Sequence, residues 1–456
     1  LNELRPKLEE ISRQAELADR VPAKQQDAFQ RQILDLHQRL TVYFAINQFE
    51  APYAIAPLAP GEEWRPIVSV ISDPAAASHP AMAAYRGIIT AYHDGDPAAF
   101  NQKVADYLAL VGRYLPSETR RAGYEVAFNR FEPFYRASAL YVLAFLLAGA
   151  GFIIGVLSKG GWARSLARPT INILLVALVA HPVGIVSRIS PQGRPPVTNL
   201  YSSAVFIGWV GVLIGLTTEW IYRLGLGSIV ASVLGFATLV VAHNLSSTGD
   251  TMEMMQAVLD TNFWLATHVV VVTIGYSATF LAGFLGIAYI GLGVFTPVLR
   301  GELGKTLPKT IYGIIAFAAL ASFVGTVLGG IWADQSWGRF WGWDPKENGA
   351  ALIVFMNLLT LHARFGGMIR ERGMAVLAVC GNIVTAWSWF GTNMLGVGLH
   401  SYGFMASAAF WLVAFVVLQL AIIFIGLMPK RLWMSFRRPR PQRETAAPTA
   451  IANQPA

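Results

Sequence analysis

Three tryptophans with charged neighbours crowd into residues 337–347, which read WGRFWGWDPKE. Flat aromatic surface beside charged groups suits a ligand that is planar, apolar and partly charged. Tryptophan is also common in belts at membrane interfaces, and we assign that role to isolated residues such as Trp332 and Trp433. The Asp-Pro step followed by Glu347 is in addition a helix-start signal. We therefore expect this tryptophan loop, residues 337–347, to cap a helix as well as to present Trp337, Trp341, Trp343 and Asp344 to a ligand.

Two histidines flank the tryptophan loop in the sequence. His268 lies near the start of a long apolar run, and His400 lies in the segment 398–403, which reads GLHSYG. A porphyrin needs aromatic surface, axial imidazoles and cationic or hydrogen-bonding partners. Two imidazoles without a third ligand suit a haem, whose iron already has four nitrogens, better than they suit zinc. The alternative for each histidine is a structural role at the membrane interface.

His181 and His362 lie inside apolar runs. Ionisable residues at such depth are costly and face a partner or a cavity, so both are candidate binding residues. The alternative is a hydrogen bond to a neighbouring helix. Arg194 is a candidate partner for a haem propionate, on its charge and its predicted side of the membrane.

The composition indicates a membrane protein, because 54% of the residues are hydrophobic and only 14% are charged. Soluble domains have about 45–50% apolar and about 25% charged residues. The net charge of +8 does not require nucleic acid as a partner. Basic residues in short loops and in the tail are explained by orientation or by contact with anionic lipid. The single cysteine, Cys380, permits no disulfide or thiol metal site within the chain.

The chain divides into three predicted regions: an external helical region over residues 1–136, a transmembrane region over 137–430, and a basic cytoplasmic tail over 431–456. The fold class is an all-α polytopic membrane helix bundle. We expect nine spans, each near the roughly 20 apolar residues that cross a bilayer. They are residues 137–157, 169–188, 201–221, 225–243, 264–293, 309–331, 349–365, 374–392 and 403–428.

The loop charges orient these spans. Basic residues follow every odd-numbered span, which places those connections in the cytoplasm, with the N-terminus outside and the C-terminus inside. The loop with Asp250, Glu253 and Asp260 falls outside, together with the tryptophan loop. His268 and His400 then lie on this same external face. Arg188 and Arg194 break the pattern and need a reason other than topology.

Four motifs, in order, resemble those of the CcsA/ResC component of System II cytochrome c biogenesis. The tryptophan loop is similar to the WWD signature of haem-handling membrane proteins, which System I subunits share. Three further segments narrow the resemblance, which covers about residues 128–428: 193–201 (GRPPVTNLY), 361–364 (LHAR) and 398–403 (GLHSYG). The family commonly has Glu where this chain has Ser202. The N-terminal region resembles the external segment of fused CcsBA proteins, more closely after Gly123 than before it. Because residue 1 is leucine and no signal peptide precedes the first helices, we expect a processed product or the later part of a longer polypeptide.

The resemblance implies roles for individual residues. The external haem ligands fall on His268 and His400, and the WWD positions fall on Trp337, Trp341, Trp343 and Asp344. The histidine that holds haem within the membrane falls on His362, and its partner comes from the CcsB/ResB half. His181 and Arg188 resemble a family pattern to which we assign no role.

The implied function is cytochrome c maturation in a bacterial plasma membrane, with the site on the external face. Haem b would cross the membrane, be presented at the WWD loop and be attached to the Cys-x-x-Cys-His segment of apocytochrome c. This makes the chain a thioether-forming holocytochrome c synthase together with a CcsB/ResB-type membrane partner. One alternative is a haem exporter that hands haem to a separate chaperone without attachment chemistry. Another is a scaffold that keeps the fold without binding haem.

Overall fold

The computed structural model describes residues 5–21, 26–73, 78–157, 162–247, 251–252, 260–398, 400 and 405–437. The chain forms two compact units, residues 1–127 and 128–456. Each unit is described by itself. Most of the predicted basic tail, residues 438–456, lies outside the described residues, as do Asp250 and Glu253 of the acidic loop.

The first unit is built from short helices. They are α1 (Leu8–Asp19), α2 (Ala28–Asn47), α3 (Ser69–Ser72), α4 (Pro80–His93), α5 (Pro97–Tyr114) and most of α6 (Pro116–Phe131). α4 packs against α5, and Met82 and Leu115 are fully buried in the core between them. The Tyr107 hydroxyl fixes the preceding loop by donating to the Ala54 carbonyl at 2.6 Å and accepting from the Ala56 amide at 2.8 Å.

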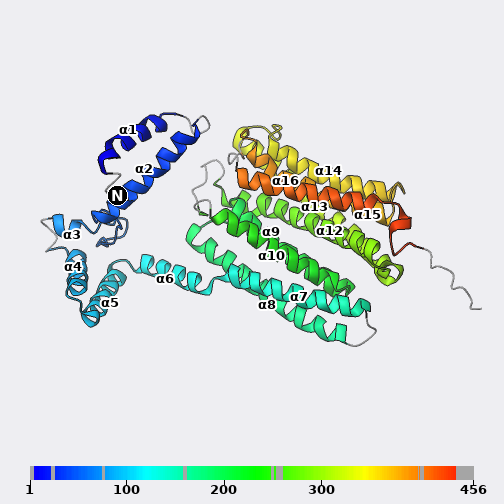
Figure 1. Ribbon diagram of the computed structural model, residues 1–456, viewed down its shortest axis with the longest axis horizontal. Coiled ribbons are helices and arrows are strands. Elements are labelled where there is room, and N and C mark those ends of the chain that lie inside the picture. The colour runs from blue at the N-terminus through cyan, green and yellow to red at the C-terminus, as the bar shows by residue number, and fades with distance from the viewer. Residues whose placement is uncertain are drawn as a thin grey trace, which may run out of the picture. The chain divides into compact units, whose positions relative to one another are not determined.

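The second unit is a bundle of long helices (Figure 1). These are α7 (Pro133–Leu157), α8 (Trp162–Gln192), α9 (Leu200–Tyr222), α10 (Leu226–Ser246), α12 (Val270–Phe295), α13 (Glu302–Trp337), α14 (Pro345–Phe365), α15 (Glu371–Ala386) and α16 (Ala406–Leu427). Each of the nine predicted spans falls on one of them. The prediction of an all-α polytopic bundle is confirmed.

Eight helical stretches in the described part of the chain are long and apolar enough to cross a membrane. The predicted seventh span, residues 349–365, is α14 and is not among these eight. α14 carries Asn348, Asn357, His362 and Arg364, which lower its apolar character. Its 21 residues nevertheless give about 32 Å of helix, enough for a hydrocarbon core of about 30 Å. It packs between α13 and α15.

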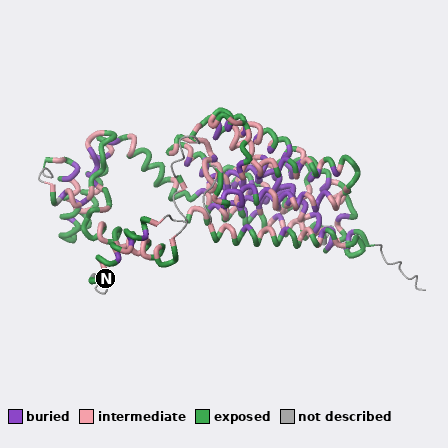
Figure 2. Tube along the Cα trace, turned by 90° about the horizontal axis from the view of Figure 1, so that it is seen from above, coloured by how far each residue is buried: buried purple, intermediate pink, exposed green. Residues whose placement is uncertain are grey.

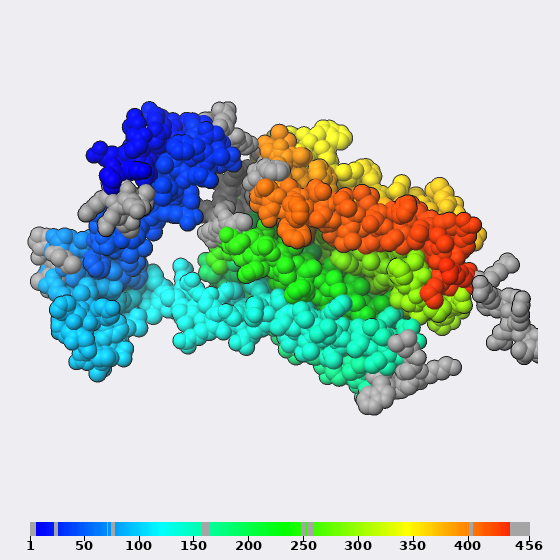
Figure 3. Space-filling view, in the orientation of Figure 1, coloured from blue at the N-terminus to red at the C-terminus, as the bar shows by residue number. Residues whose placement is uncertain are grey.

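The bundle has two groups of helices joined in the middle. α7 to α10 pack on one another, α12 to α16 form the second group, and α9 joins them by packing on α12. Buried residues concentrate along the middle of the bundle (Figure 2). α16 covers one side of the second group (Figure 3) and buries only Leu412, Gln419 and Gly426.

α12 and α13 pack closely because the glycines at their contact have no side chain. A Cβ atom added at Gly325 would lie 2.7 Å from Cα of Val272. Such a contact requires glycine, as is common where membrane helices approach backbone to backbone. This close approach sets the distance between the two helices that lead to the predicted external face.

We predict that Gly325→Ala destabilises the bundle by about 1–3 kcal/mol, because the added methyl group overpacks the contact with α12. The measurement is the midpoint of thermal unfolding of the purified protein in detergent. Gly313→Ala is the matched control, since Gly313 lies in the same helix with nothing within 4 Å of an added Cβ. Equal midpoints for the two variants contradict the prediction.

Candidate functional site

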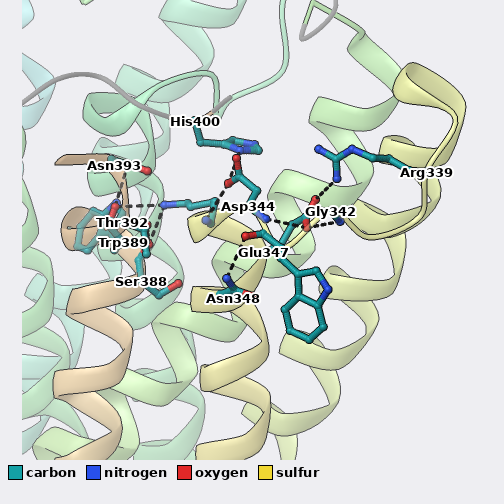
Figure 4. A network of polar contacts seen from close by, with 12 residues as sticks. Arg339, Gly342, Asp344, Glu347, Asn348, Ser388, Trp389, Thr392, Asn393 and His400 are labelled. Atoms are coloured by element: carbon teal, nitrogen blue, oxygen red, sulfur yellow. Dashed lines mark hydrogen bonds and ion pairs between the residues drawn. The ribbon is translucent and has the colours of Figure 1, made fainter. Parts of the chain in front are cut away.

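The tryptophan loop is held by a residue of the helix that follows it. α13 ends at Trp337, where Gly338 turns the chain with φ +67°. The Glu347 carboxylate accepts hydrogen bonds from the amides of Gly342 at 2.8 Å and Asp344 at 3.1 Å. It also lies 3.5 Å from the Arg339 guanidinium (Figure 4). One carboxylate therefore organises the loop through two amides and a cation.

The loop presents aromatic side chains on the surface of the protein. The rings of Trp341 and Trp343 lie nearly perpendicular with centroids 6.1 Å apart. Trp343 is 75% exposed and has φ +59°, a conformation that is strained for a bulky residue. Trp337 is half-buried at the end of α13. Strain of this kind persists where the surroundings enforce it, often at functional sites.

Asp344 joins the tryptophan loop to His400. Its Oδ1 accepts from the Lys346 amide at 2.8 Å, and it forms a capping box with Glu347 that starts α14. The predicted helix cap is thus confirmed. The same Oδ1 lies 3.3 Å from Nδ1 of His400 (Figure 4). A carboxylate can only accept, so Nδ1 donates this hydrogen bond, and in the neutral ring Nε2 keeps its lone pair.

Gly398 allows the chain before His400 to approach this carboxylate. It has φ +84°, and an added Cβ would lie 2.2 Å from Oδ2 of Asp344. Both the conformation and the space exclude other residues. Of the predicted motif 398–403, Gly398 and His400 are described, and the remaining residues lie outside the described part of the chain.

The Nδ1 atom of His268, like that of His400, is held by a hydrogen bond, in this case to a backbone carbonyl. His268 lies in a π-helical turn, Leu265–Val269, that precedes α12, and such turns occur frequently at functional sites. Its Nδ1 donates to the Gly325 carbonyl at 2.7 Å, which leaves Nε2 as the free nitrogen. The ring lies against Gly329, where an added Cβ would be 2.6 Å from Cε1.

Trp332 lies against His268, a position that our sequence analysis did not predict. We expected an interfacial anchor, but Trp332 is only 6% exposed, stacks on Trp264 and meets the His268 ring edge-on at 5.7 Å between centroids. Its indole Nε1 is buried and has no hydrogen-bond partner in the described part of the protein. Adjacent glycines one turn earlier, Gly329 and Gly330, are the sequence signal for a close approach there. Trp433 is likewise fully buried, not interfacial.

Lys346 ties the tryptophan loop to the segment that carries His400. Its ammonium donates to the carbonyls of Ser388 at 2.8 Å and Trp389 at 3.2 Å. Both carbonyls belong to a second π-helical turn, Trp387–Gly391, at the end of α15. Sequence analysis did not identify this contact, because nothing local marks it.

The structure thus gathers most of the predicted site at one end of the bundle. His268 packs against Gly329, the neighbouring Gly330 lies against the Phe340 ring of the loop, and His400 contacts Asp344 of the loop. Among the described residues, no group of three or more His, Cys, Asp or Glu side chains could hold a metal ion. The two-histidine arrangement therefore differs from a zinc site.

His362 lies near the other end of α14. It is 18 residues beyond Asp344, or about 27 Å along the helix. The ring is exposed, and its Nδ1 donates to the Leu358 carbonyl at 2.9 Å, so Nε2 points away from its own helix backbone. His362 is therefore not part of the same group of side chains.

His181 and Arg194 already have protein partners. His181 is fully buried in the α7–α10 group, where its Nδ1 is 2.9 Å from the Tyr141 hydroxyl and its ring packs on Phe134. Arg194 forms a two-pronged ion pair with Asp260, at 2.9 Å from Nε and 2.5 Å from Nη2. Arg188 stacks on the Tyr201 ring and donates to Thr251. Ser202, which stands where glutamate is common in the family that the sequence resembles, has a local role: it completes a capping box with Asn199 that starts α9.

Comparison with known proteins identifies the family to which the chain is similar. A family model described as cytochrome C assembly protein matches residues 197–400, which include His268, the tryptophan loop, His362 and His400. The cytochrome c biogenesis protein CcsA of Parasynechococcus marenigrum is 30% identical over 299 residues, 57% of this chain and 96% of that protein. CcsA of Chlamydomonas reinhardtii is 29% identical over 269 residues, 56% of this chain and 74% of that protein.

A longer relative matches more of the chain. Protein NrfI of Wolinella succinogenes is 28% identical over 410 residues, which are 86% of this chain. The match spans 44% of NrfI, less than half of that protein. The family model, the match to 96% of the CcsA protein of Parasynechococcus marenigrum and the helical bundle agree. The chain is an integral membrane protein that belongs to the CcsA family of cytochrome c biogenesis proteins.

Proposed function

We propose that this protein holds haem b as its substrate between His268 and His400 and presents it for covalent attachment to apocytochrome c. The observation that carries the proposal is that both imidazoles have Nδ1 engaged, by the Gly325 carbonyl and by Asp344 respectively. Each imidazole then offers Nε2 to an iron. Histidine ligands are oriented in this way in metal sites generally.

The surroundings fit the rest of a haem. Trp341 and Trp343 supply flat apolar surface, and Trp343 is held exposed. The Trp332 indole offers a buried donor without a protein partner, next to His268. Such a donor suits a ligand oxygen, because a buried N–H left unpaired is unfavourable. The described residues therefore offer axial nitrogens, aromatic walls and one free donor.

In the attachment step the protein positions the haem vinyl groups and the cysteine thiols, and the reacting groups belong to haem and apocytochrome. Each cysteine thiol of a Cys-x-x-Cys-His segment adds across one vinyl group, with sulfur bonding to one carbon and the proton going to the other. No electrons are lost, so no oxidant is required. The histidines and the loop contribute by holding the vinyl groups near the thiols. An activity of this kind makes the protein a thioether-forming holocytochrome c synthase.

His362 supports an earlier stage, the passage of haem through the membrane. It is exposed on α14, away from the first site, and its Nδ1 is satisfied within its own helix. An imidazole directed outward from a membrane bundle suits a ligand shared with a second protein. We propose that a CcsB/ResB-type membrane partner supplies the other axial ligand. The protein then lies in a bacterial plasma membrane with the tryptophan loop on the external face. Haem-binding roles for His181 and Arg194 stay predictions.

We predict that His268→Ala and His400→Ala each abolish the haem absorption of the external site and cytochrome c maturation in cells. Loss of one axial nitrogen leaves the iron without its second protein ligand. His243→Ala is the matched control, since His243 is exposed at the last turn of α10. Unchanged spectra and unchanged maturation in both site variants show that the assignment is wrong. Loss of haem with normal attachment to apocytochrome favours the exporter alternative.

We predict that Asp344→Asn weakens haem binding by about 10- to 100-fold, the usual effect of losing a residue that orients a histidine ligand. The amide keeps its size but no longer attracts the Nδ1 proton of His400 as a carboxylate does. Haem affinity is measured by absorbance titration of the purified protein. Asp334→Asn, at an exposed position of α13 near the same end, serves as the control. Equal affinities for the two variants contradict the role of Asp344.

We predict that His362→Ala blocks maturation in cells but leaves haem supplied from outside able to bind between His268 and His400. His362 lies in the last turn of α14, whereas the tryptophan loop lies before its first turn. Removal of the His362 imidazole therefore leaves the site between His268 and His400 intact. The readouts are cytochrome c yield in cells and haem titration of the purified protein. A parallel loss of both signals shows that His362 is structural or part of the same site.

A further inference from the structure

A pocket of about 590 Å³ lies at the end of the bundle opposite the tryptophan loop. It is formed where α13 begins, α14 ends and α15 begins. Three cations and one carboxylate surround it: Lys305, Lys309, Arg364 and Glu371. Its volume is within the range of about 300–1,000 Å³ typical of small-molecule sites. Nothing in the proposed haem presentation uses this pocket.

The cations come from two helices and converge on the opening. Lys305 and Lys309 are four residues apart on α13, so they lie on one face of that helix. Arg364 reaches from the last turn of α14, where it is held by Glu371 at 3.1 Å and by the Ile369 carbonyl at 3.3 Å. The guanidinium is thereby fixed at the rim, ready for an acidic group that can accept two hydrogen bonds.

The positive charge of the pocket exceeds what its own carboxylate balances. Lys305 pairs with Glu302 at 2.9 Å, but both side chains are well exposed, and such pairs are weak. Lys309 has no ion pair among the described residues. By contrast, Arg300 and Arg372 at the same end donate hydrogen bonds to backbone carbonyls of the C-terminal segment, including those of Met434 and Met428. The Lys309 ammonium is thus available to bind a ligand.

Apolar side chains form the rest of the lining. Met374 is 1% exposed at the base, whereas Phe365 is 90% exposed at the end of α14. Tyr312 lies one turn beyond Lys309 on α13. A ligand here meets three cations together with the apolar surfaces of Met374, Tyr312 and Phe365. That is the profile of an amphiphile with an acidic head.

We propose that this pocket binds the phosphate headgroup of an acidic phospholipid, with Lys309 and Arg364 on the phosphate and the apolar lining against the glycerol and upper acyl chains. Basic pockets between membrane helices recognise acidic lipid headgroups in this way. The cations occupy the first turns of α13 and the last turn of α14, the level at which headgroups lie. Phe365, one turn after His362, places the bound lipid beside the exposed histidine.

The test is native mass spectrometry of the full chain in detergent, titrated with phosphatidylglycerol or with phosphatidylcholine of the same acyl chains. We expect phosphatidylglycerol to bind more tightly. Lys309→Gln should weaken its binding by about fivefold, the effect of one basic residue near an acidic lipid surface, and Lys309→Gln/Arg364→Gln further still. Lys309→Arg should retain it.

Arg168→Gln is the matched control, because Arg168 is exposed at the start of α8 and lines no part of the pocket. The single Lys309→Gln variant keeps the test valid if loss of the Arg364 contacts unfolds the protein. Equal affinity for the two lipids, or equal affinity of Lys309→Gln and Arg168→Gln, overturns the proposal. Haem b is added in a final titration of the lipid-loaded protein. Displacement of the lipid by haem that depends on His362 shows that haem propionates, not a lipid, are the occupant.

Discussion

The end of the bundle that carries the tryptophan loop depends on one buried carboxylate. Asp344 caps α14 through the Lys346 amide and holds Nδ1 of His400, and Gly398 has no side chain so that the chain can pass against it. A carboxylate with 5% exposure needs partners for its oxygens, since an unpaired buried charge is strongly unfavourable. The requirement to satisfy this group links the start of a membrane helix to the position of an imidazole 56 residues later.

Departures from regular helix occur where the site needs side chains in unusual places. The π-helical turn Leu265–Val269 carries His268, and the turn Trp387–Gly391 offers its carbonyls to Lys346. Such turns free backbone groups that the regular ladder would use, and here other residues satisfy them. α12 and α13 meet at Gly325, whose carbonyl accepts the hydrogen bond from Nδ1 of His268. Close packing of the two helices and the orientation of the His268 ring therefore depend on the same residue.

Much of the bundle was predictable from sequence because apolar runs of membrane length admit few structures other than helices. The cap at Asp344 and Glu347 was also predictable, since its signal is local. The contacts that orient the histidines were not. Gly325 is 57 residues from His268, and Ser388 is 42 residues from Lys346, so no spacing rule connects them. Trp332 shows the same limit: an isolated tryptophan near a helix end suits an interface, and only its neighbour Trp264 in space reveals a different role.

The polar character of α14 has a consequence for how the protein enters its membrane. Asn357 is buried and bonds to Thr279 of α12, and the first turn of the helix is tied to α15 through Lys346. A helix with such groups gains less from the lipid alone than its neighbours do, so its partners must provide much of its stability in the bilayer. Insertion of α14 is then coupled to α12, α13 and α15. The segment that joins the tryptophan loop to His362 becomes settled only when the surrounding helices have assembled.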